Sequence, residues 1–242
     1  MCGRYAITLP PDAMRAYFAY VEQPNFPPRY NIAPTQPIPI VRLERDRDGG
    51  AARHFALVRW GLLPAWVKDP KAFPLIINAR DDGLPDKASF RGAMRHRRCI
   101  VIADAFYEWM KTPMKTRAPK RPFMIRRKSG APMAFAGLWE HWLGADGSEV
   151  ETACIVTTSA NGLVAAIHDR MPAILESTDF EAWLDTRGTS PEQAARLVRP
   201  APDDALEMVE IGPAIGSVAN DGAGLQAPAR PAPPRGDLFD ET

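Results

Sequence analysis

A cysteine directly behind the initiator methionine gives the chain two nucleophiles in one residue. Removal of Met1 would leave Cys2 with a free α-amine beside its thiol. Ordinary pKa values for these groups are roughly 7.7–8.0 and 8.5, so both react near neutral pH. The amine condenses with an aldehyde to an imine, and the thiol then closes a thiazolidine ring. The alternative is a small residue in a frayed terminus, which position alone favours.

Further polar groups stand where the surrounding pattern is apolar. A polar group in apolar surroundings is costly unless it is paired, so such residues are often functional. Each also has a structural interpretation: Asn78 could cap a turn, Glu108 could pair with an arginine, and His168 could cap a helix C-terminus. The candidates are Arg4, Asn78, Arg80, Glu108 and His168.

The elements that must hold these residues are short. The pattern predicts strands over residues 2–8, 38–43, 55–60, 76–80, 100–109, 123–126, 135–138, 151–157 and 206–211. Helices are predicted after Pro10-Pro11-Asp12, with Met14, Tyr17, Phe18 and Val21 on one apolar face, and over residues 90–98, 161–167 and 178–185. Ser190-Pro191-Glu192-Gln193 is a capping-box start for a further helix.

This alternation of many short strands with scattered helices predicts the fold class. We expect a single α+β domain over residues 1–220, built on a curved, mainly antiparallel, barrel-like sheet flanked by helices. Residues 221–242 are rich in Ala and Pro, which predicts a disordered tail.

Composition excludes several classes. Hydrophobic residues at 45% and charged residues at 24% are ordinary globular values. No apolar run approaches the ~18 residues of a membrane span, and the amino terminus has no signal-peptide core, so we expect a cytoplasmic protein with no membrane partner, nucleoid-associated if bacterial. Cys99 and Cys154 lie in apolar runs and are predicted to be buried thiols. No Cys/His spacing resembles a zinc site, so no metal or cofactor is expected.

Basic residues crowd two stretches although the net charge is only +1. These stretches are residues 91–98 and 111–128. Such runs form either a solvated face or an anion-binding groove, and the sequence leaves both open.

Six short motifs occur together and in a fixed order. They are Met1-Cys2-Gly3-Arg4-Tyr5, Arg29-Tyr30-Asn31-Ile32-Ala33-Pro34, Trp60-Gly61-Leu62-Leu63-Pro64, Ile77-Asn78-Ala79-Arg80, Phe106-Tyr107-Glu108-Trp109 and Ile167-His168-Asp169-Arg170-Met171-Pro172. With these motifs the chain closely resembles the SRAP family, the SOS-response-associated peptidases or abasic site processing proteins, over roughly residues 2–220. Two positions depart from the family pattern: Asp81-Asp82-Gly83 stands where a Glu-Thr pair is usual, and Ala105 replaces a glycine.

The resemblance implies a crosslinking chemistry. An abasic site exposes a sugar aldehyde, and family members trap it in single-stranded DNA as a thiazolidine on Cys2, which shields the lesion during the DNA damage response. By similarity, Asn78 would hold the deoxyribose, His168 would protonate the sugar ring oxygen, and Glu108 would act near the amine. A self-processing peptidase activity that removes Met1 and a lyase side reaction are further implications.

The same resemblance implies a DNA-binding surface on a monomer. Arg4 and Arg80 would take phosphates. Trp109 and Trp66 would offer stacking faces, although Trp66 suits a core position better, and Pro34 would act as a wedge against duplex. Thr157 is a further expected DNA contact.

Two other functions remain open at this point. One is an N-terminal-nucleophile cysteine hydrolase or peptidase, with Asn78 near an oxyanion. The other is a non-covalent single-stranded DNA-binding protein in which Cys2 is incidental. The mass of the protein after mixing with abasic oligonucleotide would separate the three functions.

Overall fold

The computed structural model describes residues 2–110 and 120–229. The strands are β1 (Tyr5–Ile7), β2 (Arg29–Ile32), β3 (Pro37–Arg45), β4 (Ala51–Trp60), β5 (Asn78–Arg80), β6 (Arg98–Ala103), β7 (Ala105–Trp109), β8 (Pro122–Arg127), β9 (Met133–Leu143), β10 (Glu149–Ser159), β11 (Arg170–Pro172), β12 (Ile174–Leu175) and β13 (Leu206–Glu210). The helices are α1 (Pro11–Phe18), α2 (Arg91–His96), α3 (Gly162–Ala165), α4 (Phe180–Leu184) and α5 (Pro191–Ala195), with 3-10 turns η1 (Ser177–Asp179), η2 (Pro213–Gly216) and η3 (Ala223–Gln226).

Within the described part of the chain, β3, β4, β6, β9 and β10 close into a barrel. Each neighbouring pair is antiparallel except β10 and β4, which run parallel. Beyond the barrel rim, β5 continues one edge of β10 and β11 takes the opposite edge. The predicted single α+β domain on a curved, mainly antiparallel, barrel-like sheet is confirmed.

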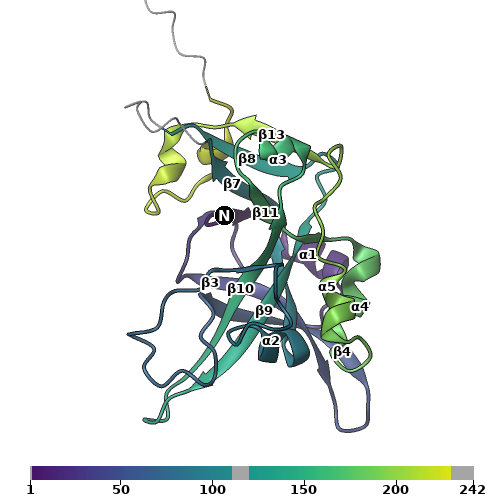
Figure 1. Ribbon diagram of the computed structural model, residues 1–242. Coiled ribbons are helices and arrows are strands. Elements are labelled where there is room, and N and C mark those ends of the chain that lie inside the picture. Colours follow the sequence, from purple (N-terminus) through teal and green to yellow (C-terminus); the bar gives the residue numbers. More distant parts are fainter. Residues whose placement is uncertain (1, 111–119, 230–242) are drawn as a thin grey trace, which may run out of the picture.

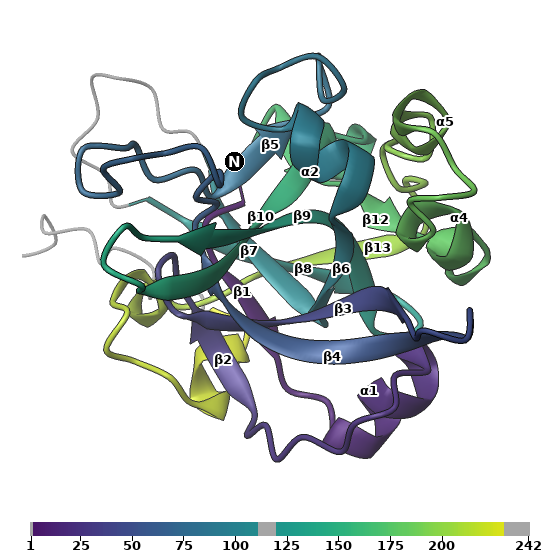
Figure 2. The same cartoon turned by 90° about the horizontal axis from the view of Figure 1, so that it is seen from below.

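A second antiparallel sheet lies against the mouth of this barrel. Its strand order is β13-β8-β7-β1-β2, and Figure 1 shows β7, β8 and β13 above the barrel strands, with the amino-terminal segment between the two layers. Tyr5 of β1 ties the layers together, because its ring meets the edges of Trp60 and Phe135 at centroid distances of 5.3 and 6.1 Å. Figure 2 shows the barrel from below, with β1 and β7 crossing behind it.

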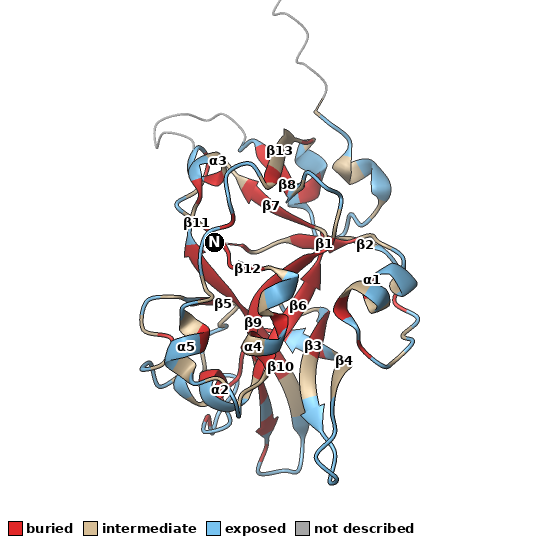
Figure 3. Ribbon diagram, turned by 90° about the vertical axis from the view of Figure 1, so that its right-hand side faces the viewer, coloured by how far each residue is buried: buried red, intermediate tan, exposed pale blue. Residues whose placement is uncertain are grey.

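Helices cover the outer faces of the strands, where apolar side chains would otherwise meet water. Figure 3 shows the buried strands at the centre and exposed helix faces at the periphery. In α1, Met14 and Phe18 are buried as predicted, and Phe18 stacks on Phe180 at 5.7 Å. Val21 was predicted on the same face but is 49% exposed. The reason is that α1 ends at Phe18, where Ala19 adopts a left-handed conformation.

The remaining local predictions have different outcomes. The capping box of α5 is present in full, and Cys99 and Cys154 are buried thiols as expected. None of the helices in residues 2–110 and 120–229 is long and apolar enough to cross a membrane. The basic loop over residues 111–119 lies outside the described residues.

The basic stretch over residues 91–98 does not form one surface. Arg91 and Arg95 are exposed, whereas Arg98 is buried. The Arg98 guanidinium donates to backbone carbonyls that include those of Trp183 and Met94, and burial lowers its pKa to about 10. Arg98 therefore fastens α4 to the barrel wall and is not part of a solvated face or an anion groove.

Residues 221–229 were predicted to belong to a disordered tail, but they make ordered contacts. Ala223–Gln226 forms η3, Gln226 Nε2 donates to the Tyr107 hydroxyl at 3.0 Å, and the Ala229 amide donates to the Glu210 carbonyl at 2.8 Å. The predicted boundary at residue 221 is therefore wrong for residues 221–229, because a side-chain contact with β7 and a backbone contact with β13 hold them, and composition reveals neither. Residues 230–242 lie outside the described residues.

Candidate functional site

Cys2 lies at the junction of the two sheets and is fully buried. Its Sγ lies 3.8 Å from the Arg4 carbonyl oxygen, to which the thiol donates. Burial raises the pKa of this thiol strongly, and the negative charge of Glu108 raises it further. Cys2 is therefore a protonated thiol at neutral pH, and any reaction there must move its proton to a nearby acceptor.

Asn78 fixes the backbone of Cys2. It begins β5, whose parallel pairing with β10 sets Asn78 opposite Ile155. Its Nδ2 donates to the Cys2 carbonyl oxygen at 3.0 Å. Its Oδ1 is buried and has no hydrogen-bond partner among the described residues. The structure therefore brings Asn78 to Cys2 and leaves an acceptor beside it that an incoming hydroxyl could satisfy.

Glu108 approaches Cys2 from the second sheet. It lies in β7 and is only 4% exposed. The neighbouring Tyr107 amide donates to the Arg4 carbonyl at 3.0 Å, so β7 runs alongside the amino-terminal segment. The influence of the Glu108 charge on the Cys2 thiol follows from this proximity. A buried carboxylate beside a buried thiol is an arrangement suited to proton transfer.

His168 stands in the turn between α3 and β11. Figures 1 and 3 both place the amino-terminal segment beside β11. The Arg170 amide lies 3.0 Å from His168 Nδ1 and would donate to it when the proton of the neutral ring is on Nε2. The same Nδ1 lies 3.2 Å from the Arg170 carbonyl and 3.1 Å from a carboxylate oxygen of Asp169, which would accept from the protonated ring. His168 is therefore held in either protonation state.

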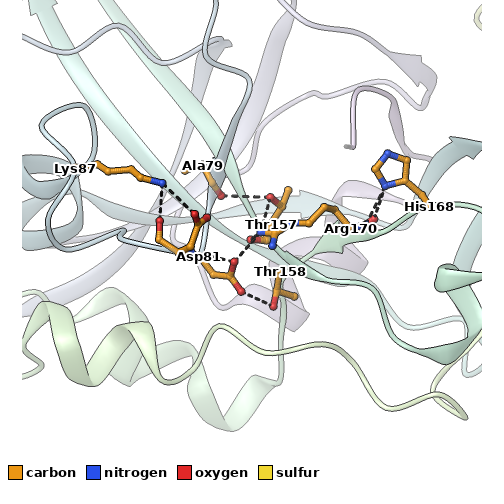
Figure 4. Close-up of polar contacts among 8 residues, drawn as sticks. Ala79, Asp81, Lys87, Thr157, Thr158, His168 and Arg170 are labelled. Carbon is orange, nitrogen blue, oxygen red and sulfur yellow. Dashed lines mark hydrogen bonds and ion pairs between the residues drawn. The ribbon is translucent and has the colours of Figure 1, made fainter.

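A polar network fastens the His168 turn to β5 and β10, as Figure 4 shows. Asp81 follows β5 and accepts hydrogen bonds from Arg170 at 2.7 Å and from the Thr158 hydroxyl at 2.8 Å. The Arg170 guanidinium also donates to the Thr157 carbonyl oxygen. Burial raises the pKa of Asp81, but the bonds from Arg170 and Thr158 outweigh it, so the pKa is lowered overall. Asp81 thus stays ionised at neutral pH.

Arg4 is engaged within the protein. Its guanidinium donates to Asn31 Oδ1 at 2.7 Å and to the carbonyls of Ile215 and Gly216 at 2.8 and 3.2 Å, and it lies 6.0 Å from the Trp109 ring centroid. Arg4 remains partly exposed. Its contacts with Ile215 and Gly216 hold the η2 turn, so the structure leaves less of this side chain for a phosphate than we expected from the sequence.

The other residues that were expected to contact DNA differ in how far they are exposed. Arg80 is exposed at the end of β5, and its guanidinium has no partner among the described residues. Thr157 is fully buried in β10, with its hydroxyl 3.5 Å from the Ala79 carbonyl oxygen. Trp109 is partly buried and packs on the second sheet.

Pro34 lies in a turn with an unusual backbone. The Gln36 amide donates to the Ala33 carbonyl, and Thr35 between them has a φ of 73°. A β-branched residue with positive φ is a genuine outlier, and such strain clusters at functional segments. Thr35 is exposed at the tip of this turn, next to Pro34.

Trp66 contradicts the preference for a core position. It is 58% exposed, and only the edge of Phe73 supports its ring, at 5.6 Å. The loop between β4 and β5 turns this side chain outward, and an apolar pattern in a loop does not reveal which residue faces water. Trp66 lies near α2 and Glu140.

Sequence reasoning missed two parts of the site. Asp81 was noted only as a departure from the family pattern, although it bonds to Arg170. Asn31 was noted only as part of a motif, but it is fully buried and donates to the carbonyls of Ser217 and Asn220. A polar residue inside an otherwise apolar motif was the available signal in the case of Asn31.

Comparisons with known proteins agree on one family. The family model described as SOS response associated peptidase (SRAP) matches residues 1–218. Abasic site processing protein YoqW of Bacillus subtilis (strain 168) is 37% identical over 223 residues, which cover 91% of this chain and 96% of YoqW. Abasic site processing protein HMCES of Xenopus tropicalis is 30% identical over 241 residues, covering 83% of this chain and 70% of HMCES.

Solved structures share the fold. A crystal structure of a protein from Bacteroides thetaiotaomicron superposes with a TM-score of 0.80 at 26% identity, covering 95% of this chain and all, 100%, of that one. A protein from Bordetella bronchiseptica superposes with a TM-score of 0.73 at 25% identity, covering 87% of this chain and 100% of its own.

Proposed function

The chain belongs to the SOS response associated peptidase (SRAP) family, and from that premise we propose that it captures abasic sites in single-stranded DNA as a covalent thiazolidine on Cys2. Relatives named abasic site processing proteins support the substrate. The observation that carries the proposal is the convergence on buried Cys2 of Asn78 from β5 and Glu108 from β7.

The reaction needs no group beyond the chain and the lesion. After removal of Met1, the Cys2 amine attacks the C1′ aldehyde, and loss of water gives an imine. The Cys2 sulfur then attacks the imine carbon, while the thiol proton passes to the imine nitrogen. A ring with one new C–N and one new C–S bond results. This route suits a thiol whose pKa burial raises, because no free thiolate has to form.

The surrounding side chains serve separate steps in this proposal. Asn78 holds Cys2 through its Nδ2 and offers its buried Oδ1 to a sugar hydroxyl. His168 donates a proton to the ring oxygen when the closed sugar opens. Glu108 receives a proton from the Cys2 ammonium, which frees the amine for attack.

Selection of single strands follows from the exposed features around the site. Arg80 supplies a cation with no competing partner among the described residues. The strained turn at Pro34 and Thr35 projects as a wedge that a continuous duplex would meet. Trp66 offers an exposed aromatic face for base stacking.

Intact mass spectrometry after mixing with an abasic oligonucleotide tests the proposal. The wild-type protein should gain the mass of the oligonucleotide less one water. Cys2→Ser and Cys2→Ala should give no adduct that survives without borohydride, although Cys2→Ala should still form a reducible imine through its new terminal amine. Turnover of an amide substrate without an adduct would favour a hydrolase, and tight binding without either product would favour a non-covalent binder.

A further inference from the structure

Strand β5, which begins with Asn78, lies on one edge of β10, and strand β11, which follows His168, lies on the opposite edge. β5 carries Asn78 and pairs in parallel with Ile155–Thr157, whereas β11 follows His168 and pairs antiparallel with Thr157–Ser159. Neither strand exceeds three residues. Ladders this short fix the spacing of the two edges weakly, so side-chain contacts must add to it.

One ion pair crosses β10 and joins these edges. The Asp81 carboxylate, directly after β5, accepts from the Arg170 guanidinium at 2.7 Å, and Arg170 is the first residue of β11. The Asp81 amide also donates to the Thr157 carbonyl at 3.0 Å, so the carboxylate is anchored at its own backbone. In Figure 4 the Asp81 and Arg170 side chains meet beside Thr157 and Thr158.

Arg170 passes this constraint to the catalytic ring. Its backbone amide lies 3.0 Å and its backbone carbonyl oxygen 3.2 Å from His168 Nδ1, so the β11 backbone holds the ring whichever nitrogen carries the proton. We infer that Asp81 is a positioning residue, which through Arg170 fixes the orientation of the His168 ring and its placement relative to Asn78. The inference rests on the function proposed above, and it assigns a role to one departure of this chain from its family pattern.

The Asp81 carboxylate is the counter-ion of the Arg170 guanidinium, and neutral groups near Arg170 do not replace it. The Arg170 side chain is only 17% exposed. Its Nε is buried without a hydrogen-bond partner in residues 2–110 and 120–229. Without Asp81, the guanidinium keeps only the neutral oxygens of Thr157. A largely buried charge without a counter-ion moves toward water, and the β11 backbone moves with it.

Imidazole nitrogen spectra of the free protein test the inference without DNA. His168 is assigned by the signal lost in His168→Ala. In the wild type the ring nitrogens should give one sharp set of signals, and Asp81→Ala should shift these signals or broaden them by exchange. Asp82→Ala is the matched control, because that carboxylate is 68% exposed and pairs only with Lys87 among the described residues; its spectrum should equal the wild type.

Crosslinking time courses on the same variants test whether this positioning affects the rate of adduct formation. Asp81→Ala should slow adduct formation by about tenfold to a hundredfold, since a displacement of 1 Å can cost about 10²-fold. Asp81→Asn keeps the shape of the side chain, and its rate of adduct formation should lie between those of Asp81→Ala and the wild type. This variant replaces Asp81→Ala in the test if Asp81→Ala does not fold. A wild-type spectrum and rate in Asp81→Ala would overturn the inference. An altered spectrum in a protein that never crosslinks would instead remove the proposed function and leave the positioning role.

Discussion

Replacing Asn78 by Ala should slow crosslinking while leaving the stability of the fold within about 2 kcal/mol of the wild type. The substitution removes the bond from Nδ2 to the Cys2 carbonyl and leaves that buried oxygen without this donor, which costs about 1–3 kcal/mol. It also removes Oδ1, a buried acceptor without a partner among the described residues, which relieves about 1–3 kcal/mol. The two effects offset each other, so the free energy of unfolding should lie within about 2 kcal/mol of the wild-type value on either side.

The rate of crosslinking, in contrast, should fall. Loss of one hydrogen bond to the sugar, worth about 0.5–1.5 kcal/mol, slows the reaction by about 2- to 13-fold, and the looser Cys2 backbone adds to this. Thermal unfolding and gel-resolved crosslinking time courses measure the two quantities. One kcal/mol shifts the midpoint by about 2–4 °C in a domain of this size.

Asn220→Ala is the matched control. Its side chain is exposed and donates to the Ala214 carbonyl at 2.8 Å, so its loss should lower stability slightly and leave the crosslinking rate unchanged. The reasoning is refuted if Asn78→Ala loses more than about 2 kcal/mol of stability and crosslinks at the wild-type rate. Oδ1 would then not be an acceptor held ready for substrate.

Three further outcomes are expected. A single residue left ahead of Cys2 should abolish adduct formation in the intact-mass assay, and an adduct on such a protein would exclude the imine route. Arg80→Ala should weaken single-strand binding and reduce the slope of log K against log salt by about 0.7 in anisotropy titrations, while Lys128→Ala, on a surface away from the site, should not. Asp81→Asn should lower stability to urea at pH 7. Because the folded-state pKa of Asp81 is lowered, the difference should begin to shrink as pH falls below the ordinary aspartate value of about 3.9, and it is lost only below the lowered folded-state pKa, where the carboxylate is protonated in both states. A difference that stays constant from about pH 7 to about pH 2 would mean that shape and not charge makes the contribution.

Local sequence patterns predicted the elements whose structure depends on their own residues. The patterns over residues 38–43 and 55–60 predicted two strands, which pair with each other as β3 and β4, and the residues after Thr189 predicted the capping box. The family resemblance assigned Asn78 to the same site as Cys2, and Asn78 Nδ2 donates to the Cys2 carbonyl oxygen.

Long-range register was beyond the sequence. The Asp81–Arg170 pair exists because β5 and β11 occupy opposite edges of β10, and residues 89 positions apart carry no mutual signal in one sequence. Trp66 and Val21 were misjudged for a related reason: an apolar residue near the end of an element faces the core or water according to where the backbone turns. The ordering of η3 and of the residues after it likewise depends on long-range contacts, from Gln226 to Tyr107 and from Ala229 to Glu210.

The burial of Cys2 has a consequence for the timing of maturation. The amino terminus leaves the ribosome first, yet its surroundings are contributed by Asn78, Glu108 and His168, the last of which is synthesised 166 positions after Cys2. At about 5–20 residues per second, translation leaves the terminus accessible for roughly 10–30 s before the pocket can close over it. An aminopeptidase acting on the nascent chain has that interval to expose the amine. A chain that folds with Met1 in place would keep its reactive residue shut away from the enzyme that should process it.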